Sequence, residues 1–135
     1  MTLKEVTDYC LKKNGAYLDY PFSPVFPVIK VGTPTYQKGR IFAQPFVLKG
    51  KAVVTLNCNP STAEYFRSIY STSVVRGYHC PPVQQPYFNT VSLDGSLSDT
   101  VILSMIDHAY DVVVAKLPKY VQAQLQGKSQ EKIYR

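Results

Sequence analysis

Residues 77–119 read GYHC-PPVQQPYFNT-VSLDGSLSDT-VILSMIDHAY-DVVVAKLPK, and this stretch carries most of the information about the fold. Two short runs rich in β-branched and aromatic residues, 73–78 and 87–93, predict strands on either side of a proline-rich loop. From about Ser98 to Lys116, apolar residues recur with the period of a helix, and Leu117-Pro118 ends the pattern. The stretch therefore predicts two strands followed by one long amphipathic helix.

Upstream of this stretch, the sequence predicts a helix, three strands and a second helix. Thr2 with Glu5 forms a capping-box pattern before an apolar helical face. The expected elements are a helix over 2–13, strands over 28–31, 40–47 and 51–58, and a helix from Asn59-Pro60 to about Tyr70. Strands in the middle and helices at both ends predict an α+β two-layer sandwich. Its antiparallel sheet should carry the N-terminal and C-terminal helices on one face.

The length of 135 residues suits one hydrophobic core, so we expect a single domain over residues 1–119 and a polar C-terminal tail over 120–135. No apolar run approaches the roughly 20 residues of a membrane helix. The first residues lack the apolar segment of a signal peptide. Cys10, Cys58 and Cys80 have no metal-like spacing and read as reduced thiols. These features predict a cytoplasmic protein with no cofactor and no membrane partner.

The positive charge of the chain is unevenly distributed along it. The net charge is +6, and no acidic residue occurs from Tyr20 to Ala63. The basic residues of interest, which we treat as candidate nucleic-acid contacts, are Lys30, Lys38, Arg40, Lys49, Lys51 and Arg76. A segment of one sign attracts phosphate. Lysines at hairpin edges also serve simply to discourage association between sheets. The sequence supports these two interpretations about equally.

A candidate polar site combines Tyr78, His79, Asn89, Asp107, His108 and Asp111. Asp107 and Asp111 share one helical face, and like charges four residues apart destabilise a helix by a few tenths of a kcal/mol. We therefore expect a compensating partner such as Arg67, Arg76 or a lysine. The favoured interpretation is structural, with His108 donating to a backbone carbonyl. The alternative is acid–base chemistry. His79, Cys80, Cys58 and His108 lack the tight spacing of a zinc site, so no metal is expected.

These landmarks, together with Tyr20-Pro21-Phe22 and Leu56-Asn57-Cys58-Asn59-Pro60, resemble the MmcQ/YjbR family of small bacterial proteins. The resemblance implies a frataxin-like (CyaY-like) sandwich whose double-wing shape is usually associated with DNA binding. The chain departs from the family pattern at Cys80-Pro81-Pro82, at Phe88, where a tryptophan is common, and at Asn57. Two positive charges typical of the family are absent as a result.

The sequence and the resemblance lead to one expected function and two alternatives. We expect a non-enzymatic cytoplasmic module that contacts DNA weakly through its basic hairpin loops. The first alternative is a small-molecule-binding or enzymatic protein with a site around His79, His108, Asp107 and Asp111. The second is a protein-interaction adaptor that uses the bare face of the sheet. A pocket that joins both histidines would favour the first alternative, and a wide apolar sheet face would favour the second.

Overall fold

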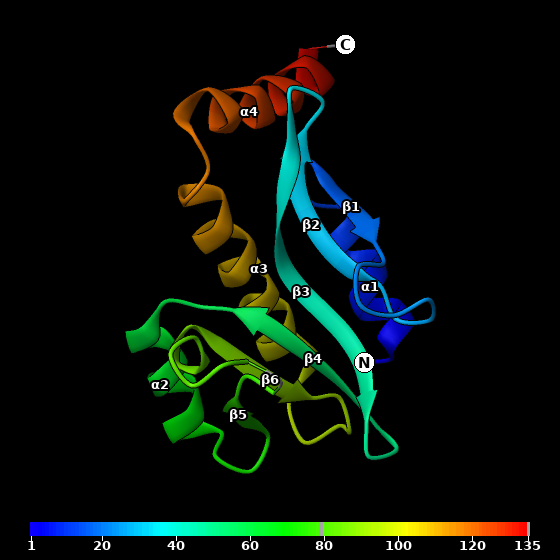
Figure 1. Ribbon diagram of the computed structural model, residues 1–135, viewed down its shortest axis with the longest axis vertical. Coiled ribbons are helices and arrows are strands. Elements are labelled where there is room, and N and C mark those ends of the chain that lie inside the picture. The colour runs from blue at the N-terminus through cyan, green and yellow to red at the C-terminus, as the bar shows by residue number, and fades with distance from the viewer. Residues whose placement is uncertain (79, 135) are drawn as a thin grey trace.

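A computed structural model of the chain describes residues 1–78 and 80–134, with side chains up to residue 127. Figure 1 shows one curved sheet with helices packed behind it. The elements in chain order are α1 (Leu3–Leu11), β1 (Ala16–Asp19), β2 (Val28–Thr33), β3 (Tyr36–Leu48), β4 (Lys51–Asn57), α2 (Pro60–Ile69), β5 (Val74–Arg76), a 3-10 turn (Gln85–Tyr87), β6 (Phe88–Ser92), α3 (Asp99–Ala115) and α4 (Lys119–Tyr134).

The sheet has six strands in the order β1-β2-β3-β4-β6-β5, and every neighbouring pair is antiparallel. The α+β class with an antiparallel sheet is thus confirmed. The 13-residue strand β3 pairs with β2 along its first half and with β4 along its second half. It therefore runs the length of the molecule, as Figure 1 shows, and the hairpins at its two ends lie far apart.

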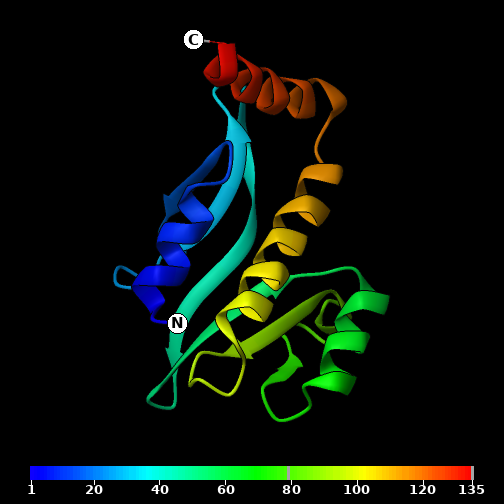
Figure 2. The same cartoon turned by 180° about the vertical axis from the view of Figure 1, so that it is seen from behind.

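Helices α1 and α3 lie on the same face of the sheet, in front of it in Figure 2. Their apolar stripes and alternate residues of the central strands form one buried core. Its fully buried members include Val6 and Cys10 of α1, Ile102 and Ile106 of α3, and Val54 of β4. Burial of each large aliphatic side chain contributes roughly 1.5–3 kcal/mol, which fixes both helices on this face. The expected placement of the first and last long helices on one face is confirmed.

The local signals at the helix starts act as expected. Thr2 Oγ1 accepts from Glu5 N–H and Glu5 Oε1 accepts from Thr2 N–H, which completes the capping box of α1. Asn59 Oδ1 accepts from Thr62 N–H at the start of α2, and Ser98 caps α3 in the same way. These side chains satisfy backbone donors that have no partner within a helix.

Strand β1 was not among the expected elements. Its four residues follow Gly15, whose φ of 74° makes the tight turn after α1. The strand pairs with β2 from Ala16↔Val31 to Asp19↔Val28. Lys30 Nζ also contacts Asp19 Oδ2 at 2.7 Å. A four-residue edge strand beside three prolines has too little alternation to be visible in the sequence.

Helix α4 crosses the end of the sheet at the β2–β3 hairpin (Figure 1). Val121 is fully buried and Leu125 is 3% exposed, and both belong to the core. Gln124 Oε1 accepts hydrogen bonds from Thr33 and Thr35, each at 2.7 Å. The segment over 120–135 was expected to be a polar tail. Its residues Val121 and Leu125 instead contribute apolar contacts to the domain.

Truncation of Leu125 tests how far this segment supports the domain. We expect Leu125→Ala to lower the free energy of unfolding by about 2–5 kcal/mol, because it leaves a cavity beside β2. Tyr120→Ala, at a residue 54% exposed on the same helix, serves as the control and should change stability by less than about 0.5 kcal/mol. Chemical denaturation measures both. Equal stability of the two variants would show that residues 120–135 act as an independent tail.

Candidate functional site

Asp107 connects α3 to α1 through two hydrogen bonds. Tyr9 Oη donates to Asp107 Oδ1 at 2.7 Å, and Lys13 Nζ contacts the same oxygen. Lys13 Nζ also lies 5.2 Å and 5.7 Å from the ring centroids of Tyr9 and Tyr110. Partial burial opposes ionisation of Asp107, but the hydrogen bonds from Lys13 and Tyr9 outweigh it and lower the pKa of the carboxyl group. The expected partner of the aspartate pair is therefore present, and it is a lysine of α1.

His108 lies between α3 and α2, with its ring edge-on to Phe66 at 6.3 Å between centroids. Its Nε2 is buried and has no hydrogen-bond partner, so the expected bond to a backbone carbonyl is not seen there. Burial lowers the pKa of the imidazole, and the nearby Asp111 carboxylate opposes that change. The ring is thus packed against an aromatic edge without the expected hydrogen bond at Nε2, and the structural interpretation of His108 stays a prediction.

Asn89 is 3% exposed and joins β6 to α2. Its Oδ1 accepts from Arg67 Nη1 at 2.7 Å, and its Nδ2 donates to Ala63 O at 3.2 Å. Tyr78, by contrast, lies on the opposite, helix-free face of the sheet, and His79 lies outside the described residues. The candidate polar residues that the structure describes therefore do not converge on one pocket.

The candidate nucleic-acid contacts lie at both ends of the sheet. Lys38 and Arg40 are exposed beside the β2–β3 hairpin, and Lys49 and Lys51 are exposed at the β3–β4 hairpin. Lys38 and Arg40 lie near the start of β3, and Lys49 and Lys51 lie at its end, so a rise of about 3.3 Å per residue separates the two pairs by roughly 30 Å. Arg76 is exposed on the edge strand β5, and Lys30 pairs with Asp19. The basic residues thus form two separated groups instead of one patch.

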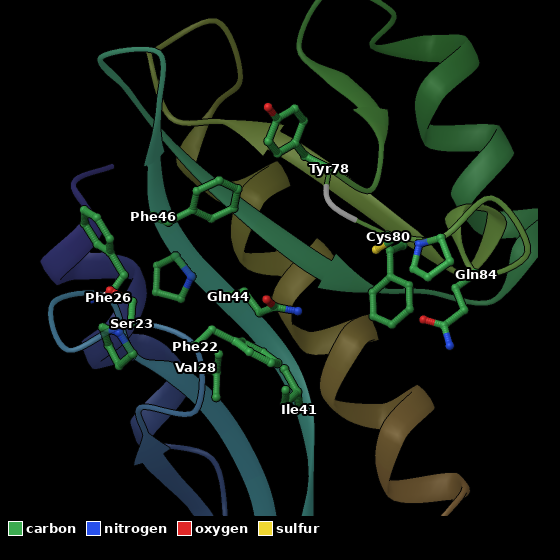
Figure 3. A pocket seen from close by; sticks show the side chains of 14 residues that line it. Phe22, Ser23, Phe26, Val28, Ile41, Gln44, Phe46, Tyr78, Cys80 and Gln84 are labelled. Atoms are coloured by element: carbon green, nitrogen blue, oxygen red, sulfur yellow. Dashed lines mark hydrogen bonds between the residues drawn. The ribbon is translucent and has the colours of Figure 1, made fainter.

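The helix-free face of the sheet holds a hollow of about 570 Å³ (Figure 3). Five aromatic side chains line it, supplied by the loop before β2, by β3, by the segment after β5 and by β6: Phe22, Phe26, Phe46, Tyr78 and Phe88. Ile41 and Gln44 of β3 form its floor. None of the lining residues that the structure describes is charged. Phe88 lines the hollow together with Cys80, Pro81 and Gln84 of the proline-rich loop.

Two loops form the walls of the hollow, and each is held by its own hydrogen bonds. In the loop between β1 and β2, Ser23 Oγ accepts from the N–H groups of Val25 and Phe26 at 3.1 and 3.2 Å. In the loop between β5 and β6, Gln85 Nε2 donates to Cys80 O at 3.1 Å. Prolines further restrict the backbone of both loops, so the walls are ordered in the folded chain.

The wall that follows β5 depends on the close approach of Gly77 to β6. Gly77 N–H donates to Phe88 O at 2.9 Å, and Tyr78 N–H donates to Thr90 Oγ1 at 2.9 Å. A Cβ at Gly77 would lie 2.6 Å from Phe88 Cβ and 2.9 Å from Cys80 Sγ, and both distances are shorter than non-bonded contacts of a Cβ atom in proteins. Only a glycine at position 77 therefore allows the loop to pass this close to β6. The Tyr78 ring then stacks beside Phe46, with centroids 6.5 Å apart.

The three thiols differ sharply in accessibility. Cys10 and Cys58 are buried, and burial raises the pKa of their thiols to about 12 and about 11. Cys80 lines the hollow and is only partly buried, with a pKa raised by burial as well. Reagents in solution should therefore reach Cys80 first, which makes it a reporter of the hollow. The sequence alone could not predict which of these three thiols is accessible.

Across residues 1–78 and 80–134, no group of three or more histidine, cysteine, aspartate or glutamate side chains is placed to hold a metal ion. Within the same residues, no helix combines the length and the apolar character needed to cross a bilayer.

Comparison with known proteins identifies close similarity in sequence and in fold. A family model described as YjbR matches residues 11–112. The uncharacterised protein YjbR of Escherichia coli K12 is 30% identical over 119 residues, which cover 88% of this chain and 92% of the relative. The corresponding protein of Escherichia coli O157:H7 matches equally well.

Two solved structures share the fold. The crystal structure of Deinococcus radiodurans protein DR2400, with a DUF419 domain, has a TM-score of 0.80 at 23% identity and covers 93% of this chain and 88% of that one. A protein from Pseudomonas syringae has a TM-score of 0.66 at 19% identity, with 84% of this chain and 99% of that one covered.

The hydrogen bonds from Tyr9 and Lys13 to Asp107 predict that the stability of the protein depends on pH. We expect Asp107→Asn to lower the free energy of unfolding by about 1 kcal/mol at neutral pH, because it weakens the hydrogen bonds from Lys13 and Tyr9. Because the folded-state pKa of Asp107 is lowered, the wild-type contribution is present above the ordinary carboxyl pKa and disappears as the pH falls through the folded value.

Asp111→Asn is the matched control, since Asp111 lies on the same helical face but is exposed. The melting temperature of Asp111→Asn should change less than that of Asp107→Asn at neutral pH. In acid, the melting temperatures of the two variants should converge. An unchanged melting temperature of Asp107→Asn combined with lost ligand binding would make this helical face the functional site.

Proposed function

This chain belongs to the YjbR family, and from that premise we propose that it is a binding protein that takes a small, uncharged, largely apolar molecule into the hollow on the helix-free face of its sheet. The observation that carries the proposal is the aromatic lining contributed by separate segments around about 570 Å³. Sites for small molecules commonly occupy 300–1,000 Å³ and combine apolar walls with a few polar groups.

The chemistry of the lining favours binding over catalysis. Among the residues that the structure describes, the lining contains no carboxylate and no cationic side chain, and burial raises the pKa of its thiol, Cys80. These groups are poor acids, bases and nucleophiles near neutral pH. Aromatic rings, in contrast, bind apolar and aromatic molecules well.

The exposed rim supports the same proposal. Phe22 and Val83, on the two loops beside the hollow, are 76% and 82% exposed. Apolar side chains left this open around a concavity are typical of surfaces that become covered by a ligand or a partner. Contact with a bound molecule would remove part of this apolar area from water.

A neutral fluorescent dye tests the proposal. We expect N-phenyl-1-naphthylamine to bind with an increase in fluorescence and to slow alkylation of Cys80 by iodoacetamide. Phe22→Ala should weaken binding roughly two- to tenfold, because one aromatic contact is lost. Val25→Ala is the control, since Val25 is 69% exposed on the same loop and is not part of the lining. Absence of dye binding, or equal loss in both variants, would refute the proposal.

A second candidate function is weak contact with nucleic acid through the two basic hairpins. Its support is the exposure of Lys38, Arg40, Lys49 and Lys51 in a segment without acidic residues. Since the two groups lie roughly 30 Å apart, one duplex would need about 9 base pairs to reach both. Such phosphate contacts would bind with little sequence preference.

Replacement of these four residues by glutamine should weaken binding to a 20-base-pair duplex about equally for all sequences and flatten its salt dependence. A hairpin duplex of about 5 base pairs, which is too short to reach both groups, should bind the wild-type protein much more weakly than the longer duplex. Fluorescence anisotropy at several salt concentrations measures both effects. Unchanged binding by the quadruple variant would exclude the basic hairpins as the contact surface.

A further inference from the structure

We infer, resting on the proposed function, that the hollow selects planar, uncharged rings that carry a hydrogen-bond donor beside an acceptor, as a lactam does, and that Gln44 recognises this edge. Gln44 lies on the floor of the hollow between the two walls (Figure 3). It is the polar side chain that β3 directs into this space.

The polar groups next to Gln44 are already engaged within the protein. Thr55, its partner across the β3–β4 pair, shares a 2.8 Å hydrogen bond with Thr90. Thr90 also accepts from Tyr78 N–H. Within the part of the chain whose side chains are described, Gln44 makes no side-chain hydrogen bond and is half-buried. Its amide is therefore a donor–acceptor pair without a protein partner at the base of an apolar space.

An amide presents its C=O and NH₂ groups side by side, so its natural complement is an edge with the same two functions in reverse. Glutamine pairs in this way with the edge of adenine. A ligand without such an edge would displace water from Gln44 without replacing its hydrogen bonds, which lowers affinity. Gln44 thus gives higher affinity to rings with such an edge than to rings of the same shape without one.

The walls and the charge of the site set the rest of the ligand class. Phe46 and Tyr78, which stack on each other, line the hollow together with Phe88, and aromatic side chains pair favourably with planar rings. Because no described residue of the lining is charged, an ionised ligand group would lose its hydration without gaining a charged partner among them. The fitting ligand is therefore a neutral planar ring with one lactam-like edge.

A pair of closely related probes tests this inference. We expect 2-quinolinone to bind about tenfold more tightly than N-methyl-2-quinolinone, which keeps the ring and the carbonyl but lacks the N–H donor. In Gln44→Met, which keeps the length of the side chain but not its amide, the ratio should fall close to one. A clash caused by the methyl group would persist in that variant, so the change in ratio isolates the hydrogen bond. Isothermal titration calorimetry measures all four affinities.

Gln84→Met is the matched control, because Gln84 also lines the hollow but is exposed at its rim. This variant should keep the tenfold ratio, and it serves as the folded reference in thermal melts. Equal binding of the two probes to the wild-type protein, or an unchanged ratio in Gln44→Met, would overturn the inference. If the apolar dye binds in those cases, the proposed function still stands. If neither the probes nor the dye bind, the proposed function fails as well.

Discussion

One constraint governs this structure: the helices of the chain cover one face of a six-stranded sheet and leave the other to loops. The core between Ile102, Ile106 and Val54 uses the apolar stripes of α1 and α3, and the tie from Asp107 to Lys13 and Tyr9 holds these helices together. Everything on the opposite face must be shielded by segments that have no regular structure of their own.

The two proline-rich loops meet that requirement only in part. They lie over the edges of the helix-free face and are held by their own hydrogen bonds, as at Ser23 and Cys80. The middle of β3 remains open between them, and its outward side chains become the floor of the hollow. The concavity is therefore a direct result of how the sheet is covered, and stiff loops make it a lasting feature of the folded chain.

Local patterns in the sequence predicted the features that depend on neighbouring residues. The capping box at Thr2, the strand expected over 51–58 and the apolar stripe of the last long helix are of this kind, and all three appear in the structure. The hollow could not be predicted, because Phe22, Phe46 and Phe88 become neighbours only through strand pairing. The partner of Asp107 was predicted as a type of residue, but Lys13 lies 94 positions away in the sequence. No local signal specifies such a pairing.

The strand order has a consequence for the way the chain folds. Strands β1 to β4 follow one another as a meander, so their contacts close short loops. Strand β6 instead pairs with β4 across α2 and β5, and this non-local step carries a larger loss of chain entropy. Because one wall of the hollow belongs to the meander and the other to the segment between β5 and β6, neither a nascent chain nor a partly unfolded one holds the complete hollow. Ligand occupancy would therefore favour the completely folded state alone.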